Sequence, residues 1–257
     1  MLIYHHFTSD TRSLLISSGI IYRCCCWQVE MRFLPESIKD DRHFRYDQRL
    51  FRLSMTTLHE QFGQIDIYLF DQILRGRIAP TMRILDAGCG FGRNLVYFIQ
   101  EGYEVFGVDS DPQAVAATRR LATFLAPGLP ETNFRVESVE AMSFPDDFAD
   151  VVLSSAVLHF ARDDDQFLAM LRGTWRVVKP GGILFCRLAS SIGMEHQMRR
   201  IAGRRFLLPD GSERYLVDEP LLIELTRERG GKLVDPLKTT VVQNQRCMTT
   251  WIMQKHK

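Results

Sequence analysis

Three glycines follow an acidic residue at regular spacing in the segment ILDAGCGFGRN, residues 84–94. Asp86, Gly88, Gly90 and Gly92 form the pattern D-x-G-x-G-x-G. An apolar run precedes the glycines and a helical pattern follows them, so they occupy a tight turn between a strand and a helix. Glycine lets the backbone of such a turn approach a ligand closely. The chemistry expected here is therefore the binding of a small molecule.

Two kinds of cofactor bind at such a loop, and spacing and charge separate them. A dinucleotide site has the pattern G-x-G-x-x-G, but Arg93 occupies its third glycine position in this chain. Asp86 would also repel a pyrophosphate. An ammonium group, by contrast, pairs with a carboxylate, and a ligand carboxylate can bind to helix N-terminal amides and to Arg93. These features predict a ligand with an amino-acid head group.

A second carboxylate, Asp109, ends the next predicted strand. It can accept hydrogen bonds from both hydroxyls of a ribose, although a role as the cap of the helix that begins near Asp111 is the alternative. S-adenosylmethionine carries both an amino-acid head group and a ribose. We therefore predict S-adenosylmethionine as the cofactor and S-adenosylhomocysteine as its product.

Four segments together resemble the class I, Rossmann-like, S-adenosylmethionine-dependent methyltransferases, and they follow the order of that family: ILDAGCGFGRN, VFGVDSDPQAV, VESVEAMSFPDDFADVVLSSAVLHF and RVVKPGGILF. The resemblance covers residues 82–188. It implies a doubly wound, mostly parallel seven-stranded α/β sheet with an antiparallel last strand and helices on both faces. It also implies an adenine contact after the third strand, where this chain has Ser138, Val139 and Glu140 in place of the family's acid.

The predicted cofactor-binding residues lie at the ends of four predicted strands: Asp86, Gly88, Cys89, Gly90, Arg93, Asp109, Ser110, Ser138, Val139, Glu140 and Ser154. Cys89 is interpreted as a small packing residue of the loop and not as a nucleophile. His159 follows the fourth predicted strand and could serve as a general base on the acceptor. The alternative is that His159 lines the pocket or caps a turn.

The elements that must position these residues alternate between strand and helix. Apolar runs predict strands over residues 82–87, 104–109, 133–137, 149–155 and 182–189. Helical patterns cover residues 94–101, 112–125, 165–178 and 220–230, and an antiparallel pair is expected at 232–242 and 247–254. Apolar strands separated by helices predict a parallel sheet that is covered on both faces.

We divide the chain into a poorly determined arm (1–30), N-terminal helices (31–80) and a methyltransferase domain (81–257). Met31 as the natural start and a flexible N-terminal tail are two open interpretations of the arm. The N-terminal helices and residues 191–220, a segment too long for a simple connection, are together predicted to form a small cap over the acceptor pocket. The basic cluster Arg199, Arg200, Arg204 and Arg205 is either a solvated face or a clamp for an anionic acceptor.

The composition limits the classes of partner that the protein is expected to bind. The 32 basic and 31 acidic residues give a net charge of +1, which offers no global electrostatic case for nucleic acid or a membrane surface. The apolar stretch LLISSGIIY, residues 14–22, is too short to span a bilayer and lacks the features of a secretory signal. The six cysteines contain no Cys-x-x-Cys pair, so we expect no structural metal and a reducing, cytoplasmic location.

Two short motifs carry no predicted chemistry. The acidic run at residues 163–165 is expected to cap a helix and not to hold a metal. Residues 179–182, Lys-Pro-Gly-Gly, are expected to form the turn into the fifth strand. The Asn/Asp-Pro-Pro-Tyr/Phe motif of enzymes that methylate amide or base nitrogens is missing after the fourth strand, which favours a small-molecule acceptor.

The predicted reaction is methyl transfer by in-line displacement, driven mainly by proximity and desolvation. Two alternatives remain open at this point. A non-catalytic S-adenosylmethionine-binding module would bind the cofactor without turning over any acceptor. A nicotinamide dehydrogenase is disfavoured by Asp86 and Arg93.

Overall fold

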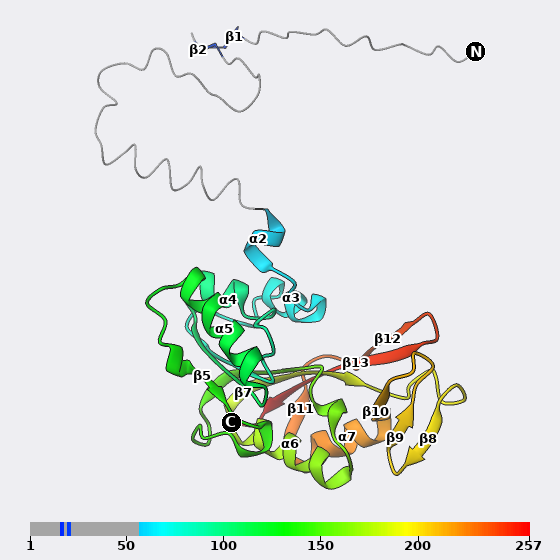
Figure 1. Ribbon diagram of the computed structural model, residues 1–257. Coiled ribbons are helices and arrows are strands. Elements are labelled where there is room, and N and C mark those ends of the chain that lie inside the picture. The colour runs from blue at the N-terminus through cyan, green and yellow to red at the C-terminus, as the bar shows by residue number, and fades with distance from the viewer. Residues whose placement is uncertain (1–15, 18–19, 22–56) are drawn as a thin grey trace, which may run out of the picture. The chain divides into compact units, whose positions relative to one another are not determined.

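The computed structural model describes residues 16–17, 20–21 and 57–257 of the chain (Figure 1). Two units make up the chain, Met1–Thr56 and Thr57–Lys257. In the first unit, the described residues are an antiparallel pair of short strands, β1 (Ile16–Ser17) and β2 (Ile20–Ile21). Met31, the three consecutive cysteines and most of the predicted N-terminal helices lie outside the described residues.

One mixed sheet forms the frame of the second unit. Its central strands run parallel in the order β7-β6-β3-β4-β5: β7 (Val178–Ala189), β6 (Ala149–Ser155), β3 (Arg83–Ala87), β4 (Glu104–Asp109) and β5 (Phe134–Val136). The path continues beyond β7 through β13 (Arg246–Lys255), which is antiparallel to β7, to β11 (Gly231–Leu233). These seven strands, with the last strand of the chain antiparallel, confirm the predicted fold class.

The sheet has one strand more than the prediction. Strand β12 (Lys238–Val242) pairs with the first half of β13, and β11 pairs with its second half, so both lie on the same edge of β13. The expected antiparallel pair at the end of the chain is thus present, but residues 232–242 contribute two short strands to it.

Helices cover both faces of the sheet (Figure 1). One core contains Leu69, Phe98 and Val115 from α3 (Ile67–Leu74), α4 (Val96–Gln100) and α5 (Pro112–Leu125). A second core contains residues of α6 (Asp164–Arg176) and α7 (Glu219–Glu228). A short helix, α2 (Leu58–Phe62), precedes α3. Within the described residues, no helix combines the length and the apolar character needed to span a membrane.

Local sequence signals explain the elements that match their predicted bounds. Helix α5 covers the predicted residues 112–125 because Pro112 suits its first position and the Asp111 side chain accepts a hydrogen bond from the Gln113 amide. Several predicted bounds were wrong by two residues or more, including the ends of α6 at Arg176 and of α7 at Glu228, which were expected at 178 and 230. Helix α4 begins at Val96, two residues later than expected, and strand β7 begins at Val178.

The predicted turn at residues 179–182 is a bulge inside β7. The pairing with β6 jumps from Ala149–Val178 to Val151–Ile183, and Gly181 takes the left-handed φ of 78°. A bulge absorbs extra residues without ending the strand. The sequence motif therefore marked an irregularity correctly but not its kind.

Residues 191–220 contain a small antiparallel sheet of their own, in the order β10-β9-β8. Its strands are β8 (Arg199–Ala202), β9 (Arg205–Leu207) and β10 (Glu213–Tyr215). Buried Ala189, Leu208 and Leu216 form a separate core beneath this sheet. The segment is thus a folded insertion between β7 and α7.

Candidate cofactor site

A cavity of about 730 Å³ opens where the parallel strands β3, β4, β5 and β6 end. Nine of the eleven predicted cofactor residues line it: Gly88, Cys89, Gly90, Arg93, Asp109, Ser110, Ser138, Val139 and Glu140. Asp86 and Ser154 do not line it. The carboxyl ends of parallel strands are the usual binding edge of such a sheet.

The glycine loop is built by left-handed backbone. Gly88, Gly90 and Gly92 have φ values of 94°, 52° and 77°. The Gly88 and Cys89 amides both donate to the Val108 carbonyl at 2.9 Å, which ties the loop to β4. A Cβ at Gly90 would meet no atom within 4 Å, so this glycine leaves its backbone open to the cavity.

Asp109 connects the glycine loop to the next helix. Its Oδ2 accepts a hydrogen bond from the Gly90 amide at 2.9 Å, and its Oδ1 accepts one from the Asp111 amide at 3.0 Å. Asp111, and not Asp109, caps α5. Each oxygen of Asp109 keeps a lone pair that can accept a ribose hydroxyl.

Asp86 lies buried behind the glycine loop, with a relative exposure of 1%. Its Oδ1 has no hydrogen-bond partner among the described residues. Burial raises the pKa of Asp86 to about 8, Arg93 opposes this rise and Asp109 adds to it. An unpartnered buried acceptor of this kind fits a ligand that supplies a cation and does not fit a phosphate.

Arg93 is the cation nearest to the glycine loop in the cavity wall. Its Nη2 donates to the Ser155 Oγ at 3.0 Å, and its Nη1 donates to the Gln64 carbonyl at 3.4 Å. Because its side chain remains 43% exposed, the guanidinium keeps donors available for a ligand carboxylate.

Another part of the cavity wall comes from the 3-10 turn Val139–Ala141 and from α6. Gln166 of α6 donates from Nε2 to the Glu140 Oε1 at 2.8 Å and so orients this carboxylate. A Cβ on Gly173 would overlap the Val139 carbonyl oxygen, so only glycine lets the helix approach the turn this closely. The predicted adenine contacts, Ser138, Val139 and Glu140, are thus held together by α6.

Two predicted residues, Ser154 and Cys89, have buried side chains, although Cys89 also borders the cavity. Ser154 is fully buried in β6, whereas its neighbour Ser155 lines the cavity, because successive side chains of a strand point to opposite faces. Cys89 is also buried, and burial raises the pKa of its thiol. A protonated thiol is a poor nucleophile, which agrees with the packing role expected for Cys89.

His159 is buried beside the cavity and does not line it. Its Nδ1 accepts a hydrogen bond from the Ala189 amide at 3.0 Å, so the neutral ring carries its proton on Nε2. Burial, with a smaller contribution from Arg214, lowers the pKa of His159 to about 4. These features favour an anchoring role, and the general-base role remains a prediction.

Sequence reasoning missed half of the cavity wall: Gln64, Phe91, Asn94, Ser155, Ala156, Val157, Phe160, Gln166 and Met170. Strand alternation implies that Ser154 and Ser155 point to opposite faces, but it does not say which of them faces the cavity. Ala156 has a φ of 64°, an uncommon conformation for a residue with a side chain that is often found at functional sites. No sequence motif indicated that Gln64 would line the cavity.

The predicted cap contributes none of the residues that line the cavity. It reaches the rim through Arg214, whose guanidinium lies 4.8 Å from the centroid of the Phe160 ring. In the basic cluster, Arg204 pairs with Asp218 at 2.9 Å and Arg205 pairs with Glu213 at 2.7 Å. Two of the four arginines therefore hold the insertion together.

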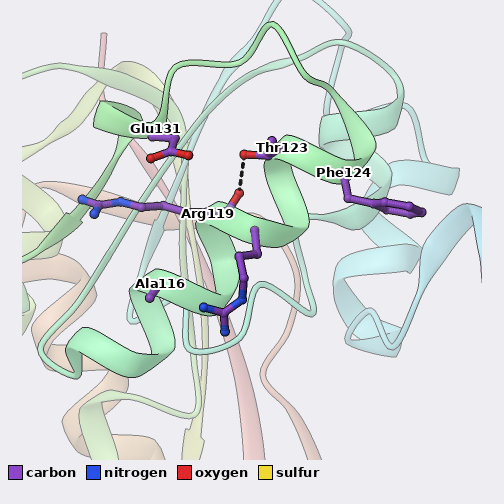
Figure 2. A pocket seen from close by; sticks show the side chains of 6 residues that line it. Ala116, Arg119, Thr123, Phe124 and Glu131 are labelled. Atoms are coloured by element: carbon purple, nitrogen blue, oxygen red, sulfur yellow. Dashed lines mark hydrogen bonds between the residues drawn. The ribbon is translucent and has the colours of Figure 1, made fainter.

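A second hollow of about 500 Å³ lies on α5 (Figure 2). The Thr123 hydroxyl donates to the Arg119 carbonyl, as Figure 2 shows, and the Arg119 guanidinium donates to the Phe134 carbonyl. These polar groups are already paired within α5 and with β5, so we assign no binding or catalytic role to this hollow.

The acidic run at 163–165 caps α6, as expected: the Asp163 side chain accepts a hydrogen bond from the Gln166 amide. Over the part of the chain that the structure describes, no group of three or more His, Cys, Asp or Glu side chains could hold a metal ion.

Comparisons with known proteins agree with this geometry. Residues 85–186 match the family of methyltransferase domains. The 2-methyl-6-phytyl-1,4-hydroquinone methyltransferase of Synechocystis is 37% identical over 108 residues, which are 42% of this chain and 32% of that protein. The ubiquinone biosynthesis O-methyltransferase of Bradyrhizobium is 28% identical over 169 residues, 60% of this chain and 63% of that protein.

The chain thus spans less than two thirds of the length of these curated relatives. A crystal structure of the Burkholderia thailandensis 1,6-didemethyltoxoflavin-N1-methyltransferase, with 1,6-didemethyltoxoflavin and S-adenosylhomocysteine bound, is similar to this chain. Its TM-score is 0.56 and its identity 20%, and the match covers 89% of this chain and 94% of that chain. At this identity the likeness shows the fold. Residues 85–186 therefore belong to the family of methyltransferase domains, within a chain that has the class I, Rossmann-like methyltransferase fold.

Proposed function

We propose that this protein is an S-adenosylmethionine-dependent methyltransferase that acts on a small-molecule acceptor. The observation that carries the proposal is the placement of two carboxylates around one glycine loop. Asp109 lies in the cavity wall, and Asp86 lies behind the loop with Oδ1 unpartnered. Asp109 can bind a ribose, which both kinds of cofactor carry, so the distinction between them rests on Asp86, whose unpartnered carboxyl oxygen suits an ammonium group and not a phosphate.

The chain's own residues divide the binding work. Asp109 would receive the ribose hydroxyls, Asp86 the ammonium group and Arg93 the carboxylate of the amino-acid end. Val139 and Glu140 would contact the adenine, together with Ser138. When bound, the cofactor supplies a methyl group already activated on a sulfonium. The protein then has to exclude water and align the acceptor.

The acceptor is proposed to bind beside Phe160, whose ring lines the cavity and is 61% exposed. In the transfer, an acceptor atom forms a bond to the methyl carbon while the carbon–sulfur bond breaks and its electron pair stays on sulfur. The proton of the acceptor passes to solvent or to a base. The names of the relatives, which include hydroquinone and ubiquinone-pathway enzymes, support a small acceptor with a ring.

We also propose that the insertion at 191–220 borders the acceptor through Arg214, which stacks on Phe160. Removing residues 194–212 should then lower acceptor turnover. A reducing, cytoplasmic location is proposed as well, because Cys89, Cys186 and Cys247 are free, buried thiols.

Transfer of a labelled methyl group to a panel of phenols, hydroquinones and nitrogen heterocycles tests the reaction. Turnover of at least one acceptor, lost in Asp109→Ala and kept in the surface variant Asp146→Ala, is the expected result. Cofactor binding without turnover of any acceptor would instead favour a binding module.

A further inference from the structure

Asp66 occupies a buried junction of three elements that meet beside the cavity. It caps α3 with Oδ1, which accepts a hydrogen bond from the Tyr68 amide at 3.0 Å. Its Oδ2 accepts hydrogen bonds from the Arg187 Nη1 of β7 at 3.0 Å and from the Ser155 Oγ of β6 at 3.3 Å. The side chain of Asp66 has no solvent exposure. A helix cap alone would use only one of these interactions.

The same junction holds Arg93. The Nη2 of Arg93 donates to the Ser155 Oγ at 3.0 Å and lies 4.0 Å from the Asp66 Oδ2, and its Nη1 donates to the Gln64 carbonyl at 3.4 Å. Asn94 accepts a hydrogen bond from the Asp66 amide at 3.0 Å, which fixes the backbone next to Arg93. The segment between α2 and α3 is thus hydrogen-bonded to the end of the glycine loop.

Charge explains why a carboxylate is needed at this point. Two guanidinium groups, from Arg93 and Arg187, lie against the single buried carboxylate of Asp66. The Asp66–Arg187 pair is neutral, so the charge of Arg93 remains available to a ligand. Without the carboxylate, the two positively charged guanidinium groups would repel each other. Arg93, which is the more exposed of the two, would then move.

We propose that Asp66 is a positioning residue that holds the Arg93 guanidinium in the orientation that binds the carboxylate at the amino-acid end of the cofactor. This inference rests on the proposed function. It makes the segment ahead of the family domain, residues 64–66, part of the binding machinery. Asp66 acts through Arg93 and does not itself line the cavity.

The test compares two ligands that differ in the group Arg93 would bind. S-adenosylhomocysteine has the amino-acid end, and 5′-methylthioadenosine has the same nucleoside and thioether without it. Calorimetry with Asp66→Asn, which can still cap α3 through its amide oxygen, should show a rise of about tenfold in the Kd for S-adenosylhomocysteine. The Kd for 5′-methylthioadenosine should stay within about twofold of the wild-type value. A change of that size corresponds to less free energy than one charged hydrogen bond contributes.

Asp218→Asn is the matched control. Asp218 caps α7 and pairs with Arg204 at 2.9 Å, so this change removes the same kinds of interaction away from the cavity. It should alter neither Kd. Should Asp66→Asn fail to fold, Ser155→Ala removes the hydroxyl between Asp66 and Arg93 and should give a smaller loss with the same selectivity.

Equal losses for both ligands, or no loss for either, would overturn the positioning role and leave the proposed function intact. A further Asp66→Asn change in an Arg93→Gln background should add no loss for S-adenosylhomocysteine, and a full additional loss would also overturn the role. Wild-type protein that binds neither ligand would instead refute the proposed function, and this inference with it.

Discussion

Gly88 and Val157 are packed so closely that a Cβ on Gly88 would overlap the Val157 Cγ2 and lie 2.9 Å from its Cγ1. Gly88 also has a φ of 94°, which a residue with a side chain rarely adopts. Gly88→Ala should therefore shift the glycine loop and raise the Kd for S-adenosylhomocysteine by at least about tenfold, or about 1.4 kcal/mol. Calorimetry measures the change.

Gly76→Ala is the control for the cost of placing a side chain on a left-handed backbone without a steric clash. Gly76 has a φ of 67°, but a Cβ there would meet no atom within 4 Å. Its expected effect is a loss of stability of about 1 kcal/mol with unchanged cofactor affinity. An unchanged Kd in Gly88→Ala would show that the loop does not contact the ligand.

The raised pKa of Asp86 predicts that cofactor binding is coupled to the release of a proton. Since the pKa of Asp86 is about 8 in the free protein, most molecules carry this proton at pH 7. An ammonium group beside the carboxylate favours the charged form, so the proton should leave when S-adenosylhomocysteine binds. The affinity should then increase as the pH rises toward 8.

Calorimetry at pH 7 in buffers of different ionisation enthalpy counts this proton. We expect release of up to about one proton in the wild type and almost none in Asp86→Asn. The ligand 5′-methylthioadenosine, which lacks the ammonium group, should release none. Equal proton release for both ligands would exclude Asp86 as the ammonium partner.

His159 predicts a loss of stability in mild acid. Its pKa is about 4 in the folded protein, below the ordinary value of 6.5, so the unfolded chain binds more protons between these two values. The free energy of unfolding should fall as the pH drops through this window, by at most about 1.4 kcal/mol per pH unit. Urea unfolding of the wild type and of His159→Gln at pH 7 and pH 5 should show a smaller fall for the variant.

The same variant tests the catalytic hypothesis. Because Nδ1 of His159 already accepts the Ala189 amide, we expect His159→Gln to lower kcat by less than about tenfold. Loss of a general base would lower it by about a hundredfold or more. A loss of that size would establish His159 as a catalytic residue.

Much of the frame could be predicted because its signals are local. Continuous apolar runs marked β4 and β6, and Pro112 after Asp111 marked the start of α5. The glycine loop and Asp109 were found because their spacing along the chain already fixes their neighbourhood at adjacent strand ends.

The rest depends on contacts between distant segments. No motif in the sequence singled out Asp66, and only the fold brings Arg187, 121 residues away, to within 3.0 Å of it. Ser154 and Ser155 are adjacent and identical, so only the orientation of β6 tells which one faces the cavity. The pKa of His159 likewise depends on burial that no local pattern reveals.

The ion pair between Arg77 and Asp235 connects the end of α3 to the segment between β11 and β12, and we expect it to stabilise the fold. Both of its oxygens accept hydrogen bonds from Arg77, at 2.7 Å and 3.0 Å, and this contact leads the causes that lower the pKa of Asp235 to about 2. Asp235→Asn should cost about 2 kcal/mol at pH 7, because it removes the buried carboxylate that pairs with the partly exposed Arg77 guanidinium. The difference from wild type should shrink as the pH falls below about 4 and toward the folded pKa.

Asp146→Asn is the exposed counterpart in the same urea experiment. Asp146 pairs with Arg176 at 2.8 Å, but its side chain is 74% exposed, so less than about 1 kcal/mol should be lost. Equal losses in the two variants would contradict a structural role for the Arg77–Asp235 pair.

The central claim is that the glycine loop and its two carboxylates bind an amino-acid nucleoside and not a dinucleotide. Parallel calorimetric titration of the full chain with S-adenosylhomocysteine and with NAD tests it most directly. We predict saturable binding of S-adenosylhomocysteine that weakens in Asp109→Ala, with no binding of NAD. Tight binding of NAD, with no response to S-adenosylhomocysteine, would contradict the account.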